Sequence, residues 1–433
     1  VANTYEDGIA QAVNAGLNIR THFTPPADFI LPLRKAVADG KISQETLDKR
    51  VAEILRVKFW LGLFDNPYRG NGKQAEQIVH SKEHQAVSLE AARQSLVLLK
   101  NEMNLLPLSK SLRSIAVIGP NADERTQLIC RYGPANAPIK TVYQGIKERL
   151  PHTEVIYRKG CDIIDPHFPE SEVLPFDITP KEQQMMDEAI EAAKSAEVVI
   201  MVLGGSEVTV REERSRTSLD LPGRQEELLK AVCKLGKPTI LVMIDGRASS
   251  INYAKKYVPA ILHAWFPGEF CGQAVAETIF GDNNPGGRLA VTFPKSVGQI
   301  PFAFPFKPGS DSGCGTSVTG ALFPFGHGLS YTTFEYSNLR ISPEQQGVLG
   351  EVKVSCTVKN TGKRIGDEVV QLYLRDEISS VTTYVKILRG FERITLQPNE
   401  EKEVTFTLSP QDLAIWDKNM KFQVEPGTFK VMI

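Results

Sequence analysis

The chain has 433 residues, which at roughly 150 residues per domain suggests about three domains. Lys and Arg number 50 and Asp and Glu number 51, so the formal net charge is −1 and no excess of cations is available to bind nucleic acid. Hydrophobic residues make up 42% and charged residues 23%, which excludes a largely disordered chain. The longest apolar run, Val198–Leu203, is far too short to span a membrane. We therefore expect neither a nucleic-acid partner nor a membrane segment.

The cysteines and the chain ends carry further expectations. The six cysteines are sparse and none forms a C-x-x-C pair, so neither a disulfide framework nor a zinc site is supported. Cys233 and Cys356 lie in apolar periodic segments and are expected to be buried. The chain begins at Val1 with no signal sequence after it, and residues 427–433 have the pattern of a strand that is cut short. We expect sequence to be missing at both ends.

Residues 1–68 are predicted to be helical with one short strand around Leu17–Arg20. Three helices are expected, at residues 6–15, 28–39 and from the Ser43 cap to Gly62. Three helices and one strand cannot bury a large core, so this segment is expected to be the tail of a larger α/β domain. Residues 69–80 are predicted to be a linker, because Asn66–Gln74 is rich in turn formers.

Residues 81–330 are predicted to form a doubly wound, mostly parallel α/β sandwich that begins with a helix over Ser81–Lys100. Five apolar strands are expected, at residues 114–118, 153–157, 198–203, 239–244 and 260–265. Helices are expected between and after them, at residues 143–150, from the capping box of Thr179 and Glu182, at 225–235 and at 272–280. Continuous apolar strands that alternate with helices indicate a parallel sheet covered on both faces.

Residues 331–433 are predicted to form an antiparallel β-sandwich of the fibronectin III type. Apolar and polar residues alternate over Val352–Val358, Val370–Leu374 and Val404–Leu408, with turn formers between these runs. These residues hold no convergent cluster of His, Asp or Glu, so the domain is expected to be structural.

Two motifs that would indicate a cofactor or a metal are weak or missing. The turns after two of the strands, Gly119–Ala122 and Gly204–Glu207, lack the G-x-G-x-x-G pattern, and no P-loop is present. His80 and His84 match the H-x-x-E-H spacing of one metalloprotease class and could share a helix face. No third ligand lies nearby, so a solvated first helical turn is the preferred interpretation. We expect no metal and no organic cofactor.

The loop after Val198–Leu203 has the densest charge in the chain. It carries three glutamates among three arginines, namely Glu207, Arg211, Glu212, Glu213, Arg214 and Arg216. The loop leaves the carboxyl end of a parallel strand, where open α/β sheets bind ligands. One interpretation is a solvated surface loop. The other is that one Glu is a general acid which reaches into a neighbouring domain, with its partner carboxylate supplied from elsewhere.

Several segments match the pattern of a known enzyme family. They are Leu55–Asp65, Ser95–Asn101, Ile115–Ala122, Trp265–Gly268, Gly281–Gly286 through Thr292–Pro294, and Phe323–Tyr331. On these segments the chain resembles the C-terminal part of a glycoside hydrolase family 3 enzyme, of the bacterial β-glucosidase/β-xylosidase kind. The resemblance implies the tail of a truncated (β/α)8 barrel over residues 1–68, then the α/β sandwich, then the fibronectin III-like domain.

The resemblance implies a retaining enzyme that removes terminal β-linked glucose or xylose. The family's nucleophile is an Asp in a Ser-Asp-Trp-like motif, which this chain lacks, so the nucleophile is expected upstream and the fragment alone is expected to be inactive. The family's acid/base Glu lies a few residues before an Arg that precedes a Leu-x-Leu-Pro-Gly-like stretch. Counting back from Arg216 assigns that role to Glu212, with Glu213 and Glu207 as alternatives. Ser215 stands where the family often has Asp.

The resemblance also bears on substrate contacts and partners. Arg20 and Thr21 would follow the last barrel strand, at the face where barrel sites lie, and could touch the sugar; a core or salt-bridge role is the alternative. The expected substrate is an oligosaccharide or aryl β-glycoside, the expected location is the periplasm or the exterior, and a homodimer is left open. The rival functions are a non-catalytic carbohydrate-binding or scaffold fragment and a phosphorolytic enzyme of the same fold.

Overall fold

The computed structural model describes residues 2–21, 23–68, 70–126, 133–134, 136–310 and 317–433. The chain divides into two compact units, Val1–His84 and Gln85–Ile433, which are described in turn. Among the helices that the structure describes, none has both the length and the apolar character that crossing a membrane would require.

The N-terminal unit is built from short helices around a small core. Its helices are α1 (Tyr5–Ala15), α2 (Ala27–Ala38), α3 (Gln44–Trp60) and α4 (Gly72–Ile78). The core consists of Ile9, Ala10, Val13, Ala36 and Ile42. Ser43 caps α3 as predicted, because its side chain accepts a hydrogen bond from the Thr46 backbone N–H.

One prediction for this unit is wrong. Residues 17–20 form no strand, because a strand needs a neighbouring strand to take its backbone hydrogen bonds and the described part of this unit supplies none. Within the stretch expected to be a linker, the Asn71 side chain accepts from the Lys73 N–H and starts the short helix α4.

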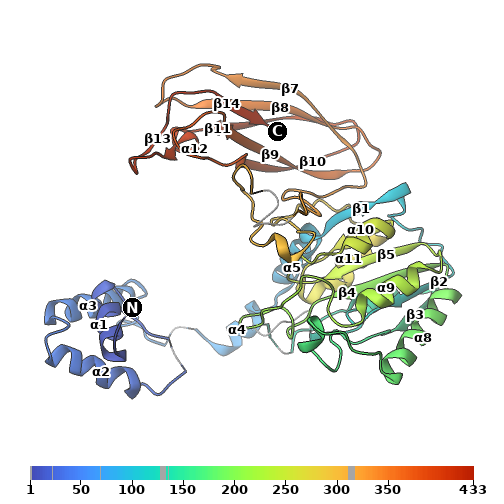
Figure 1. Ribbon diagram of the computed structural model, residues 1–433, viewed down its shortest axis with the longest axis horizontal. Coiled ribbons are helices and arrows are strands. Elements are labelled where there is room, and N and C mark those ends of the chain that lie inside the picture. Colours follow the sequence, from blue (N-terminus) through green and yellow to red (C-terminus); the bar gives the residue numbers. More distant parts are fainter. Residues whose placement is uncertain (1, 22, 69, 127–132, 135, 311–316) are drawn as a thin grey trace. The chain divides into compact units, whose positions relative to one another are not determined.

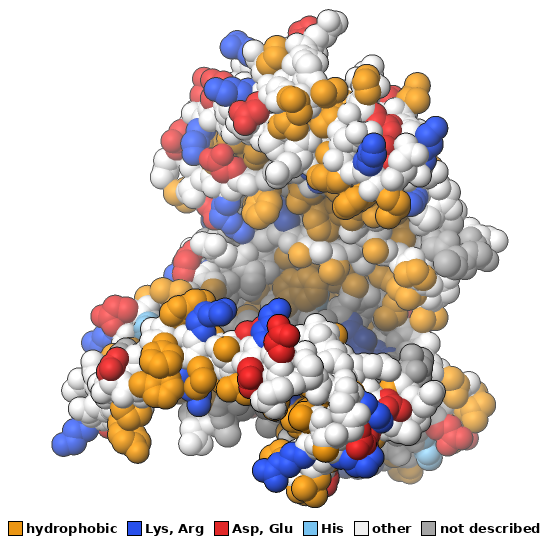
Figure 2. All heavy atoms as spheres, turned by 90° about the vertical axis from the view of Figure 1, so that its left-hand side faces the viewer, with side chains coloured by type: hydrophobic (Ala, Val, Ile, Leu, Met, Phe, Trp, Pro, Cys, Tyr) orange, Lys and Arg blue, Asp and Glu red, His pale blue; other side chains and the backbone are white. Residues whose placement is uncertain are grey.

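The N-terminal unit leaves many large apolar side chains in contact with solvent. None of the 17 residues of α3 is buried, and Phe59 and Trp60 are 65% and 77% exposed. Hydrophobic side chains are prominent on the face of the molecule shown in Figure 2. A helix normally buries one face, whereas the apolar side chains of α3 stay half-buried or exposed within this unit.

The C-terminal unit begins within α5 (Lys82–Ser95) and contains a six-stranded sheet (Figure 1). In spatial order its strands are β1 (Val97–Asn101), β6 (Ala260–His263), β5 (Thr239–Ile244), β4 (Val198–Gly204), β2 (Ser114–Ile118) and β3 (Glu154–Arg158). All neighbours are parallel except β1, which is antiparallel to β6. The predicted mostly parallel sheet is confirmed. The helix expected over Ser81–Lys100 is wrong at its end, because Val97–Leu99 is buried at every position and belongs to β1 of the sheet.

Helices cover both faces of this sheet, as expected for a doubly wound fold. They are α7 (Val142–Arg149), α8 (Pro180–Ser195), α9 (Gln225–Cys233), α10 (Asn252–Tyr257) and α11 (Cys271–Ile279). One apolar core includes α5, α7 and α11, and the other includes α8, α9 and α10. The capping box of Thr179 and Glu182 starts α8 as predicted.

The remaining strands form an antiparallel sandwich, which confirms the fibronectin III-like prediction (Figure 1). One sheet has the order β11 (Glu401–Leu408), β8 (Val352–Asn360) and β7 (Phe334–Ser342), and the other β10 (Ile387–Leu396), β9 (Gly366–Asp376) and β14 (Phe429–Met432). A short helix α12 (Pro410–Leu413) and the hairpin of β12 (Ile415–Trp416) and β13 (Phe422–Gln423) precede β14. The alternating side chains of β8 and β9 point into the shared core.

Segments that carry the family resemblance attach this sandwich to the α/β layer. The Asn284 Oδ1 accepts from the Tyr331 N–H at 2.8 Å, and its Nδ2 donates to the Ile365 carbonyl at 3.0 Å. Arg288 Nη2 binds Glu368 Oε2 at 2.9 Å in a largely buried ion pair. These signature residues therefore have a structural role.

Four of the six cysteines are described, and all four are free thiols. Cys356 is 3% exposed, as predicted, whereas Cys233 is only half-buried at the end of α9. Cys130 and Cys314 lie outside the described residues.

His263, at the end of β6, is a buried titratable group in the sheet core. Its ring is fully buried, with Nδ1 3.3 Å from the Met243 carbonyl and Nε2 without a partner, and it packs against Trp265 and Phe293. Burial lowers the pKa of His263 from 6.5 to about 4, because the charged ring would lose its hydration.

We predict that the free energy of unfolding falls as the pH drops from about 6.5 to 4. The unfolded histidine binds a proton near pH 6.5 and the folded one only near 4, so the full loss is roughly 3 kcal/mol. Urea unfolding at several pH values should show that His263→Leu reduces this dependence. His152→Gln, at an exposed position, is the control; equal pH dependence in all three proteins would contradict the prediction.

Candidate active site

The charged loop lies between β4 and α9, and a buried amide fixes the last residue of β4, from which the loop departs. Gln225, at the start of α9, is fully buried, and its Oε1 accepts from the Gly204 N–H at 2.8 Å. Its Nε2 donates to the carbonyls of Gly204 at 2.8 Å and Ile163 at 3.2 Å. Both ends of the loop are thereby held at the carboxyl end of β4.

A second buried amide joins the neighbouring strand ends. Asn121 follows β2, and its Nδ2 donates to the Gly205 carbonyl at 3.1 Å and to the Ile244 carbonyl at 3.2 Å. The carboxyl ends of β2, β4 and β5 therefore meet at one edge of the sheet, where ligands bind in folds of this kind.

Arg247, which follows β5, binds the loop on both sides of its tip. Its Nε donates to the Thr209 carbonyl at 3.1 Å, and its Nη2 donates to the Arg214 carbonyl. The Arg247 backbone N–H donates to Asp245 Oδ1 at 3.1 Å, and Ser249 Oγ donates to Asp245 Oδ2 at 2.5 Å. Burial raises the pKa of the Asp245 carboxyl. Arg247 thus holds the two residues that flank the four-residue tip of the loop.

A buried ion pair holds the loop beyond its tip. The Arg216 and Glu172 side chains are only 4% and 6% exposed, and Arg216 Nε binds Glu172 Oε1. Glu172 Oε2 also accepts from the Thr217 N–H at 2.9 Å, and Arg216 Nη1 donates to the Asp220 carbonyl at 3.0 Å. Arg216 is therefore a structural anchor.

The three candidate carboxylates differ in their placement on this loop. Glu207 lies in its first turn, where its Oε1 accepts from Arg211 Nη1 at 3.2 Å. Glu212 and Glu213 are exposed at the tip, in a turn that the Arg214 N–H closes on the Arg211 carbonyl at 3.1 Å. Glu213 has a φ of 63°, in the left-handed region that few non-glycine residues adopt. An exposed carboxylate on a firmly held loop can exchange a proton with a bound reactant.

The two residues expected to touch a sugar lie in the N-terminal unit. The Arg20 guanidinium lies 5.0 Å from the ring centre of Phe29 and 5.7 Å from that of Tyr5. At these distances the guanidinium packs on both rings through cation–π contacts, which favours the core role over sugar contact for Arg20. Thr21 is exposed.

Comparison with known proteins identifies the family. The model of the glycosyl hydrolase family 3 C-terminal domain matches residues 96–331, and that of the fibronectin type III-like domain matches residues 368–433. The chain belongs to glycosyl hydrolase family 3.

Relatives of this family 3 chain are glycosidases. A β-xylosidase from Formosa agariphila is 41% identical over 93% of this chain and 55% of its own length. A periplasmic β-glucosidase from Salmonella typhimurium is 37% identical over 99% of this chain and 58% of its own length. The chain spans a little more than half the length of these relatives.

Solved β-glucosidases share the fold of the family 3 chain. One from Erythrobacter marinus matches with a TM-score of 0.91 and 34% identity, over 100% of this chain and 59% of that chain. One from Listeria innocua in complex with glucose matches with a TM-score of 0.86 and 28% identity, over 100% of this chain and 58% of that chain.

The histidine pair of the family 3 chain does not share a helix. His80 lies in a turn with a φ of 59°, and α5 begins after it at Lys82, so only His84 is helical. Across the described ranges, no group of three His, Cys, Asp or Glu side chains could hold a metal ion.

The loop anchors Asn121, Glu172, Gln225 and Arg247 were not singled out from the sequence. Arg247 follows the all-apolar strand β5, as the charged loop follows β4. The same rule about strand ends could have identified it.

We predict that Glu172→Ala lowers the free energy of unfolding by about 3–5 kcal/mol, because Arg216 would stay buried without its carboxylate. Urea unfolding followed by circular dichroism measures the effect. Glu170→Ala removes an exposed carboxylate two residues away and should change stability by less than about 0.5 kcal/mol. Equal losses in both variants would contradict a role for the buried pair.

Proposed function

We propose that this chain is the C-terminal part of a retaining β-glycosidase that removes terminal glucose or xylose, with Glu212 as its acid/base. Membership of family 3 and the β-glucosidases and β-xylosidases among its relatives support the reaction class. Because the chain spans about half of those relatives, the proposal concerns the whole enzyme to which the chain belongs.

The observation that carries the assignment is the anchoring of the loop on either side of Glu212. Arg247 binds the carbonyls of Thr209 and Arg214, and Arg216 is buried against Glu172. The exposed tip between these anchors contains Glu212 and Glu213, whereas Glu207 lies before the tip. The family spacing from Arg216 then favours Glu212 over its neighbour.

The mechanism follows from two carboxyl groups with different tasks. A nucleophilic Asp from the upstream part of the enzyme attacks the anomeric carbon, while the Glu212 carboxyl protonates the departing glycosidic oxygen. Glu212, now a carboxylate, removes a proton from water, which hydrolyses the glycosyl-enzyme. A retaining enzyme needs these two carboxyl groups about 5–5.5 Å apart in the assembled site.

The N-terminal residues 1–68 fit the tail of the barrel in this proposal. The helix α3 buries none of its residues, although Val51, Val57 and Phe59 are apolar, so it is suited to pack against further elements. We assign residues 69–80 to the connection, 81–330 to the α/β sandwich and 331–433 to the fibronectin III-like domain. The packing of Arg20 on Phe29 and Tyr5 favours a structural role over sugar contact.

The remaining assignments follow from relatives. The substrate class is a β-linked oligosaccharide or aryl β-glycoside, consistent with the glycosidases named above. One relative is named a periplasmic enzyme, which supports export of this protein. The chemistry requires no metal or organic cofactor, since two carboxyl groups supply all proton transfers.

We predict that Glu212→Ala in the full-length enzyme slows substrates with poor leaving groups by at least roughly 10²-fold. Substrates whose leaving group needs no proton should lose much less in the first step. Added azide should then restore turnover and give a β-glycosyl azide, because a small anion attacks the intermediate without a general base. Steady-state kinetics and product analysis measure both effects.

Glu213→Ala and Glu207→Ala are the matched controls on the same loop, and neither should show azide rescue. If Glu212→Ala retains normal activity on a disaccharide while one control shows the rescue, the acid/base role belongs to that residue. If no variant on the loop affects turnover, the scaffold or carbohydrate-binding alternative is the better account.

A further inference from the structure

The fibronectin III-like domain contains a mixed polar and aromatic pocket remote in sequence from the Glu212 loop. Its volume is about 730 Å³, within the range of roughly 300–1,000 Å³ that small-molecule sites occupy. The walls come from β10, the end of β9, the loop over residues 381–384, and the β12–β13 hairpin.

Two buried polar atoms in this pocket have no partner in the protein. Asp376 Oδ1, at the end of β9, and Arg389 Nε, on β10, are both buried without a hydrogen bond. Leaving such atoms unpaired costs free energy, so each one calls for an explanation such as a bound water, ion or ligand group. Burial raises the pKa of Asp376 and lowers that of Arg389, as expected for charged groups that have lost hydration.

A β-bulge directs Arg389. Leu388 pairs with Tyr373 and Gly390 pairs with Leu372, so Arg389 is an extra residue with no partner on β9. Bulges of this kind turn a side chain away from the regular alternation and are frequent beside functional sites.

Aromatic side chains lie at the mouth of the same pocket. Trp416 is 59% exposed and Phe422 50%, with their rings 5.4 Å apart, and Tyr384 is 41% exposed. Flat apolar rings that remain in solvent are suited to stack on a ligand with an apolar face.

The charged side chains that line the pocket indicate whether it suits an ionic or a neutral ligand. The pocket contains three basic side chains, Lys307, Arg389 and Lys418, and three acidic ones, Asp376, Asp412 and Asp417. A balanced lining does not favour an anion or a cation. One unpaired acceptor and one unpaired donor fit hydroxyl groups, which both donate and accept.

We propose that this pocket binds a neutral saccharide unit, with one sugar face on Trp416 and its hydroxyl groups on Asp376 and Arg389. The site is independent of the Glu212 assignment. It replaces the purely structural role that the sequence suggested for this domain.

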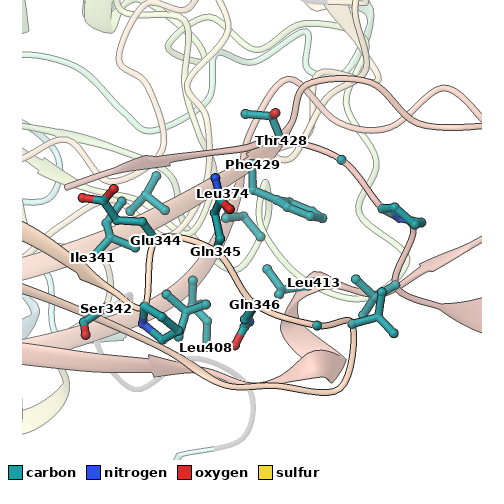
Figure 3. A pocket seen from close by; sticks show the side chains of 18 of the residues that line it. Ile341, Ser342, Glu344, Gln345, Gln346, Leu374, Leu408, Leu413, Thr428 and Phe429 are labelled. Carbon is teal, nitrogen blue, oxygen red and sulfur yellow. The ribbon is translucent and has the colours of Figure 1, made fainter.

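A neighbouring hollow of about 1010 Å³ lacks these features (Figure 3). It shares Leu374, Leu413 and Phe429 with the pocket and lies between the aliphatic core and the loop that carries Gln345 and Gln346. None of the buried unpartnered atoms found in the described ranges lines it. It therefore carries no comparable argument for a ligand.

The test is calorimetric titration of the 433-residue chain with cellotetraose, xylotetraose and, separately, inorganic phosphate. At least one tetrasaccharide should bind, and Trp416→Ala and Arg389→Met should each weaken that binding at least about tenfold. Phe391 lies on β10, as Arg389 does, but outside the pocket. Phe391→Ala removes this exposed ring and should leave the affinity for the tetrasaccharide unchanged. Glu212→Gln should also leave it unchanged, which separates this site from the proposed catalytic one.

The proposal is overturned if neither tetrasaccharide binds, or if Trp416→Ala and Arg389→Met bind as the parent does. Phosphate binding that needs Arg389, without saccharide binding, would identify an anion site instead. Circular dichroism checks that each variant folds. If Trp416→Ala does not fold, Tyr384→Ala and Asp376→Asn are titrated in its place. We expect the same loss of saccharide affinity in both variants.

Discussion

The guanidinium of Arg247 holds the loop on which the proposed chemistry depends. A loop of nearly twenty residues, 205–223, would otherwise have many conformations, and a general acid works only within hydrogen-bond reach of its oxygen. By binding the carbonyls of Thr209 and Arg214, Arg247 fixes both flanks of the tip while leaving Glu212 exposed. Arg247 is itself held through Asp245, so the position of the tip follows from the rigid end of β5.

The anchors farther from the tip use burial as well as hydrogen bonding. Gln225 and Asn121 pair with backbone groups at the strand ends, and Arg216 is enclosed with Glu172. Removing one member of such a set leaves a buried polar group without its partner, so we expect the whole loop to be destabilised. A largely buried ion pair of the same kind, between Arg288 and Glu368, joins the α/β sandwich to the fibronectin III-like domain.

Sequence patterns correctly predicted the strands that are buried along their whole length. β4 and β5 are apolar at nearly every position and were predicted at almost their observed bounds, whereas β1 was absorbed into the preceding helix because no turn former separates them. The position of the loop after β4 at a strand end made it a candidate site, with a solvated surface loop as the alternative, but its anchors bring together residues as distant in sequence as Glu172 and Arg216. The pocket around Arg389 was missed because a β-bulge, which sets the direction of this side chain, does not change the alternation of apolar and polar residues in the sequence.

The central claim is that Arg247 acts through Glu212, and a double-mutant cycle in the full-length enzyme tests it most directly. The measured quantity is kcat/KM for a β-glycoside with a poor leaving group, in Arg247→Ala, Glu212→Ala and the double variant. Arg247→Ala alone should be slower by at least about tenfold, and the double variant should be no slower than Glu212→Ala, because the positioned group is already gone. Losses that multiply in the double variant would contradict the account, since Arg247 would then act independently of Glu212.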